Sequence, residues 1–98
     1  MGSCIVIALG GNAIKQAHEH GTFVEQYGNI NRIAPQVVAL LKEGHHIILT
    51  HGNGPHVGSL LIQQEAAKDH VPEQPLDVLG AMTQGQIGYM LQQAMQNE

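Results

Sequence analysis

Two runs of apolar residues, each followed at once by glycines, constrain the fold of this 98-residue chain more than any other feature. The first run is Cys4–Leu9, and the second is residues 47–50. Both are rich in β-branched residues and are continuous rather than alternating, a pattern typical of strands buried on both faces of a parallel sheet. Because glycines follow, at positions 10, 11, 52 and 54, we expect each strand to end in a tight turn.

The segment between these runs has the spacing of a helix, with apolar residues three and four positions apart. Gly44 follows the last of them and is placed as the helix terminator. Pro35 lies inside the pattern, which predicts either a kinked helix or one that starts late, with Pro35 in its first turn. Strand, helix and strand together predict a βαβ crossover and hence a parallel sheet.

Two further helices are predicted after the second strand. One begins at Pro55, a residue favoured in a first helical turn, and runs to about Lys68; a polar connection follows at residues 70–75. A long helix starts at Leu76. It contains three glycines, which imply either close backbone packing or a break, and both alternatives stay open: Gly80, Gly85 and Gly88.

Composition excludes several classes of protein. Four Lys and Arg residues against eight Asp and Glu give a net charge of −4, which disfavours a nucleic-acid partner. The single cysteine, Cys4, indicates a reducing compartment, and we expect a cytoplasmic protein. No apolar run approaches the roughly 20 residues that span a bilayer. The seven histidines follow no zinc-binding pattern and are expected at the surface or in loops, although His51 and His56 bracket the second glycine turn.

The glycine turns are the candidate ligand site. Turns at the carboxyl ends of neighbouring parallel strands form the crevice in which open α/β sheets bind ligands, and free backbone N–H groups there favour an anion. The two asparagine amides add further donors. The alternative is that the glycines only satisfy backbone torsions. The predicted anion contacts are Gly10, Gly11 and Asn12 in the first turn and Gly52, Asn53 and Gly54 in the second.

Two common nucleotide-binding motifs do not fit these turns. A Walker loop is excluded because no lysine follows any glycine. The dinucleotide fingerprint is a near miss, since the second turn is spaced G-x-G-x-x-x-G. The acidic residues that would hold a ribose in such a site are only loosely placed: Asp69, Glu73 and Asp77.

Residues 5–13, 50–58 and 75–81, continuing as 84–90, closely resemble the carbamate kinases of the amino acid kinase superfamily. Members of that family are much longer, so residues 1–98 resemble their N-terminal portion, with the ATP-binding half absent. The resemblance implies a three-layer α/β/α sandwich with a mainly parallel sheet, present here as an incomplete part. It also implies a homodimer that acts on a small-molecule substrate.

The same resemblance implies reversible phosphoryl transfer between carbamoyl phosphate and ADP, giving ATP and carbamate, as in arginine catabolism. By position, Gly10, Gly11 and Asn12 would contact the transferred phosphoryl group, and Gly52, Asn53 and Gly54 the carbamate. ATP or ADP with Mg²⁺ would bind mainly in the absent half, and no catalytic or metal-ligating residue is assigned to this chain. Lys15 is expected to be a solvated loop residue. The alternative is a non-catalytic truncated remnant or dimerisation module of that family.

Overall fold

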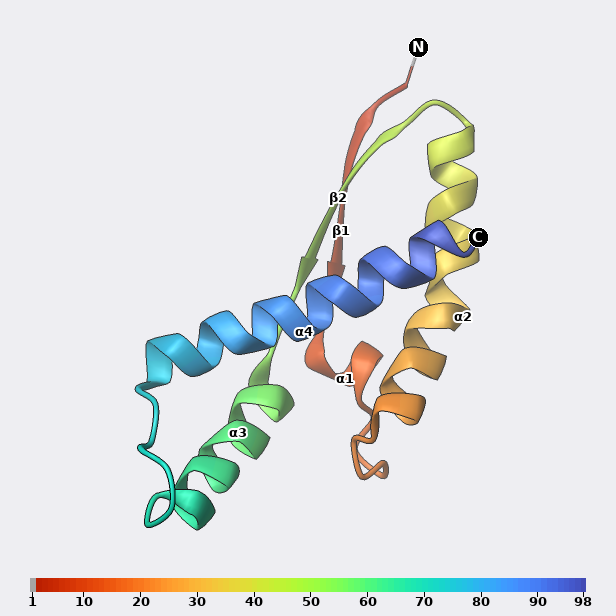
Figure 1. The fold of residues 1–98 in the computed structure, drawn as a ribbon. Helices are drawn as coiled ribbons and strands as arrows, with labels where there is room; N and C mark the ends of the chain where they lie inside the picture. The colour runs from red at the N-terminus through yellow and green to blue at the C-terminus, as the bar shows by residue number, and fades with distance from the viewer. Residues whose placement is uncertain (1) are drawn as a thin grey trace.

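The predicted βαβ unit is present. The computed structural model describes residues 2–98, in which the elements are β1 (Cys4–Leu9), α1 (Gly11–Ile14), α2 (Phe23–Lys42), β2 (His46–His51), α3 (Gly54–Ala67) and α4 (Leu76–Gln96) (Figure 1). β1 and β2 pair in parallel, with Cys4 opposite His46 and Leu9 opposite His51. Both glycine turns therefore leave the sheet at the same edge, and α4 crosses the structure close to it (Figure 1).

Helix α2 begins earlier than its apolar pattern indicates. Thr22 and Glu25 form a capping box: the Glu25 N–H donates to Thr22 Oγ1 at 3.2 Å, and the Thr22 N–H donates to Glu25 Oε1 at 3.0 Å. These bonds satisfy N–H groups of the first turn and start the helix at Phe23, with Pro35 well inside it. The predicted late start at Pro35 is therefore wrong.

The end of α2 is where the sequence places it. Gly44 has φ 92°, a left-handed conformation that favours glycine. Its N–H donates to the Leu41 carbonyl at 3.0 Å, and the His45 N–H donates to the Leu40 carbonyl at 3.2 Å. This pair of bonds is a Schellman motif, and the prediction that Gly44 terminates the helix is confirmed.

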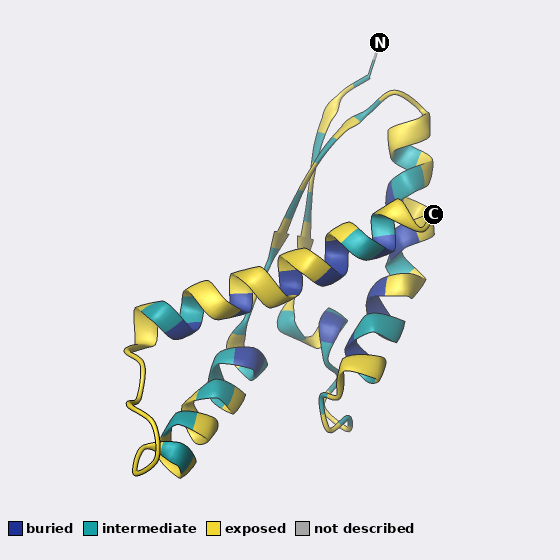
Figure 2. Cartoon of the chain, viewed as in Figure 1, coloured by how far each residue is buried: buried dark blue, intermediate teal, exposed yellow. Residues whose placement is uncertain are grey.

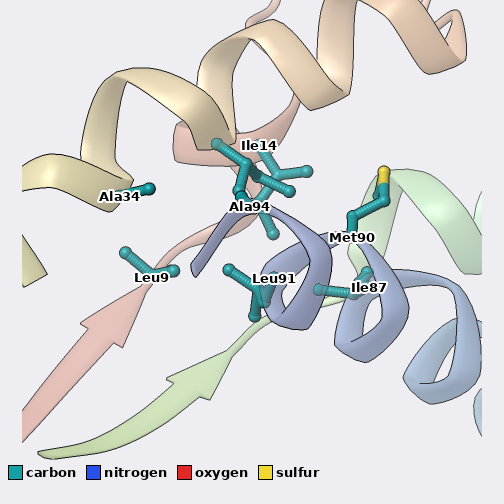
Figure 3. Close-up of a cluster of buried hydrophobic side chains, with 8 residues drawn as sticks. Leu9, Ile14, Ala34, Ile87, Met90, Leu91 and Ala94 are labelled. Carbon is teal, nitrogen blue, oxygen red and sulfur yellow. The ribbon is translucent and has the colours of Figure 1, made fainter. Parts of the chain in front are cut away.

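The core lies where α2 and α4 pack against the end of β1. Ile87, Leu91 and Ala94 of α4 point toward Leu9 and Ala34 from the other two elements (Figure 3). Ile14 of the short helix α1 completes the same cluster, so the first glycine turn is held against the core by the residue that follows it. Met90 of α4 is buried here as well.

The two strands are covered on one face only. Burial alternates along both: Leu9 is buried and Ile7 and Leu49 pack against the core, whereas Val6 and Ile48 are 62% and 51% exposed. The prediction that both faces are buried is wrong for residues 2–98, because the helices of this part of the chain cover a single face (Figure 2).

Helix α4 is unbroken despite its three glycines. A Cβ built on Gly80, Gly85 or Gly88 would meet no atom within 4 Å, so these positions face open space. Neither the break nor the close backbone packing expected from the sequence is found among the described residues. No helix within residues 2–98 combines the length and apolarity needed to cross a membrane.

Candidate functional site

The two glycine turns lie in contact with each other. A Cβ built on Gly11 would lie 3.0 Å from Pro55 Cδ, and one built on Gly52 would lie 3.4 Å from the Gly11 nitrogen. The Gly52 N–H also donates to the Leu9 carbonyl at 3.0 Å, which extends the strand pairing into the turn. A larger residue at Gly11 would push the turns apart, since a 3.0 Å contact is too short for carbon atoms.

Backbone donors are left over at this junction. Asn53 is the N-cap of α3, yet its side chain makes no capping bond, and Gly10 is the N-cap of α1. The N–H groups of Gly54 and His56 have no acceptor within residues 2–98, and the same holds for the first two amides of α1. A Cβ built on Gly10 or Gly54 meets nothing within 4 Å, so there is room beside these donors.

The Asn53 side chain lies differently from its predicted role. Its Nδ2 donates to Thr83 Oγ1 of α4 at 3.0 Å, and the Thr83 hydroxyl in turn donates to the Gly80 carbonyl at 2.6 Å. One of the two amide hydrogens is thus used inside the protein. Asn12, the corresponding residue of the first turn, is exposed.

His56 connects the second turn to α2. It is only 5% exposed, and its Nε2 lies 2.6 Å from Gln26 Oε1. Gln26 Nε2 donates to the Gly21 carbonyl at 2.7 Å, so Oε1 is the acceptor and His56 Nε2 carries the proton. Burial lowers the pKa of His56, with His51 and Lys15 adding repulsion, which keeps the ring neutral. The expectation of a surface or loop histidine is wrong here.

A pocket of about 130 Å³ lies beside the second turn, on the α2 side. Pro55 belongs to both the turn junction and the pocket, but none of the six predicted contact residues lines it. Lys15, expected to be solvated, is half-buried there, with its stem against Gly21. The lining residues are Lys15, Gly21, Gln26, Pro55, His56, Ser59, Leu60, Gln63 and Gln86.

Two residues that fix the second turn were not predicted from the sequence. Gln26 and Thr83 are both buried polar residues within helices. Each lies 30 positions from its partner in the turn, and a polar residue on a helix carries no local sign of such a contact. The available signal was their place on the apolar faces of α2 and α4, where a buried polar group needs a partner.

Comparison with known proteins identifies the family. The family model described as "Amino acid kinase family" matches residues 3–98. The chain is 49% identical to carbamate kinase of Pyrococcus furiosus over 100% of its own length and 32% of that protein's. It is 52% identical to carbamate kinase of Thermococcus kodakarensis, over 96% of this chain and 31% of that one.

Solved structures agree with this match. Carbamate kinase from Giardia lamblia bound to citric acid superposes with a TM-score of 0.93 and 49% identity, over 98% of this chain and 31% of that one. The same enzyme bound to AMP-PNP gives a TM-score of 0.93 over 98% of this chain and 34% of that one. The chain spans about a third of the length of the relatives it matches, and its resemblance to carbamate kinases is confirmed. The chain belongs to the amino acid kinase family.

Proposed function

We propose that residues 1–98 are the carbamate- and phosphate-binding part of a carbamate kinase, an enzyme that transfers a phosphoryl group reversibly between carbamoyl phosphate and ADP. The main observation that supports this proposal is the junction of the glycine turns. There, unpaired backbone N–H groups at the starts of two helices face open space. Such donors stabilise oxygen atoms that carry negative charge. Support also comes from relatives near 50% identity, one of them solved with citric acid and with AMP-PNP.

In this proposal the first turn receives the transferred phosphoryl group and the second turn the carbamate. Gly10, Gly11 and Asn12 contact the phosphoryl oxygens, and Gly52, Asn53 and Gly54 contact the carbamate end. These groups bind and orient the anion as hydrogen-bond donors. Lys15 is the cation nearest the turns along the chain and is half-buried beside the second one.

Within residues 2–98, no three His, Cys, Asp or Glu side chains lie close enough together to share a metal ion. Phosphoryl transfer depends on cations that neutralise the charge of the transition state. We propose that ATP or ADP with Mg²⁺ binds mainly outside this part, and that the 98-residue chain alone does not turn over.

The second candidate is a non-catalytic remnant that keeps the surface for a homodimer. It is favoured by apolar residues left exposed on α3, where Leu61 and Ile62 are 47% and 72% exposed. A large apolar surface is typical of an interface between subunits. Under either proposal the protein acts in the cytoplasm.

Substitution of Gly10 tests whether the junction binds an anion. Gly10 has φ −69° and ψ 163°, which alanine adopts without strain, and the added Cβ meets nothing within 4 Å. Gly10→Ala should therefore not lower the melting temperature but should weaken binding of inorganic phosphate, because the methyl group occupies the space beside the donors. The measurement is a phosphate titration followed by amide chemical shifts, with Gly85→Ala as the matched control. Equal phosphate affinity in the original chain, Gly10→Ala and Gly85→Ala would show that the glycine turns have only a structural role.

An activity assay separates the kinase from the remnant. ATP formation from carbamoyl phosphate and ADP is measured for the 98-residue chain and for a chimera joining it to the remaining two thirds of the Pyrococcus furiosus relative. We expect no ATP from the chain alone and ATP from the chimera. Turnover by the chain alone would contradict the proposed division of the site. An inactive but folded chimera would favour the remnant.

A further inference from the structure

Thr83 determines which end of the Asn53 amide faces α4. Its hydroxyl hydrogen is donated to the Gly80 carbonyl at 2.6 Å, so Thr83 Oγ1 presents only lone pairs to its other neighbour. Asn53 Nδ2 donates to those lone pairs at 3.0 Å. Because Thr83 is 0% exposed, water does not compete for its hydroxyl. The Asn53 side chain is therefore held in one orientation.

This contact prevents the Asn53 side chain from capping α3, which is the usual role of asparagine at the N-cap position. Asparagine is among the best N-cap residues, since its side-chain oxygen accepts from the second or third N–H of the helix. Here the N-cap makes no such bond, and its backbone has φ −142° and ψ 13°. The second residue of α3 is Pro55, which has no N–H, so a capping Asn53 would occupy the N–H of His56, one of the groups that an anion needs. The contact with Thr83 therefore leaves the N–H of His56 without a protein acceptor.

Besides the approach of Pro55 to Gly11, few side chains orient the start of α3. His56 is the only buried residue that this helix contributes, and it faces Gln26 of α2. The side of the turn nearest α4 is held by the Asn53–Thr83 bond. Apolar packing contributes little here, because Leu61 and Ile62 of α3 are exposed and Val57 and Leu60 are only partly buried.

We propose that Thr83 is a positioning residue for the anion site: by binding Asn53 Nδ2 it keeps the side chain of the N-cap off the first turn of α3. The proposal rests on the proposed function of the glycine turns. Thr83 itself touches no ligand. Its hydroxyl acts through Asn53, so the effect of losing it must depend on the presence of the Asn53 side chain.

The test measures binding of inorganic phosphate to the 98-residue chain, followed by the amide shifts of Gly54 and His56. Thr83→Val keeps the shape of the side chain and removes the hydroxyl, and we expect it to weaken phosphate affinity about three- to tenfold, the worth of one hydrogen bond. Thr83→Ser keeps the hydroxyl and should bind as the original chain does. If Thr83→Val does not fold, Thr83→Ala takes its place.

A double variant distinguishes a positioning role of Thr83 from a general contribution to the stability of the fold. In an Asn53→Ala background, Thr83→Val should no longer change phosphate affinity, because no side chain remains to be held away. The same loss in both backgrounds, or no loss in either, would overturn the inference. Absence of phosphate binding by the original chain would instead overturn the proposed function on which it rests.

Discussion

Helix α4 buries six side chains, five of them apolar, whereas α3 buries only His56. Apolar packing gains energy in proportion to the area removed from water but has no preferred direction. A hydrogen bond contributes less energy but fixes the relative orientation of two groups. The core side of the molecule therefore supplies stability, and the polar contacts at the start of α3 supply the geometry of the second glycine turn.

The largest effect is expected in the core. Ile87→Ala removes a buried side chain from the cluster around Leu9, and we expect the free energy of unfolding to fall by about 2–5 kcal/mol. Ile62→Ala on α3 is the matched control, because Ile62 is 72% exposed, and its effect should stay within about 0.5 kcal/mol. Urea unfolding measures both. Equal losses would show that α3 is packed as tightly as α4.

A smaller effect is expected from pH at the start of α3. The pKa of His56 is lowered from its ordinary value of 6.5, chiefly by burial, so below pH 6.5 the unfolded chain binds more protons than the folded one. The free energy of unfolding should therefore decrease as pH falls through 6.5, and the decrease should end once the folded form is also protonated. His51 and Lys15 are the charged groups that contribute to the shift.

The control for this pH dependence is His56→Gln. A glutamine amide can still donate to Gln26 Oε1 but does not titrate. Urea unfolding of both proteins between pH 8 and pH 5 should show a loss in the original chain that the variant lacks. Parallel pH profiles would contradict the neutral, buried state of His56.

The smallest effect is a gain within α4. Gly85→Ala adds a methyl group that meets no atom within 4 Å and restricts the unfolded chain, so stability should rise by about 0.5–1 kcal/mol. Gly44→Ala is the opposite case, because φ 92° is strained for alanine, and it should lower the melting temperature. A destabilising Gly85→Ala would mean that the helix needs its glycine for a contact that residues 2–98 do not show.

The elements that could be predicted from the sequence are those marked by a short pattern of neighbouring residues. The β-branched runs gave both strands, Pro55 gave the start of α3 and Gly44 gave the end of α2. The start of α2 also had a local signal, the Thr22 and Glu25 pair, but the apolar spacing drew attention to later residues. In each case the signal and the structural feature that it specifies lie within a few residues of each other in the chain.

The candidate site was predictable only in part. Adjacent parallel strands bring their turns to one sheet edge, so the meeting of Gly11 with Pro55 follows from topology. The partners of Asn53 and His56 lie on other helices, 30 residues away in the chain. Their identity depends on how α2 and α4 cross, which no local pattern specifies.

The exposed face of the sheet should also promote self-association of this chain in solution. Val6 and Ile48 form exposed apolar neighbours in register on strands whose outer edges carry unpaired backbone groups. Strands of this kind attract other strands, so molecules should adhere to one another more as they are concentrated. Phosphate titrations are therefore best made at two protein concentrations. Val6→Lys should improve solubility without disturbing the opposite, core-facing side of the sheet.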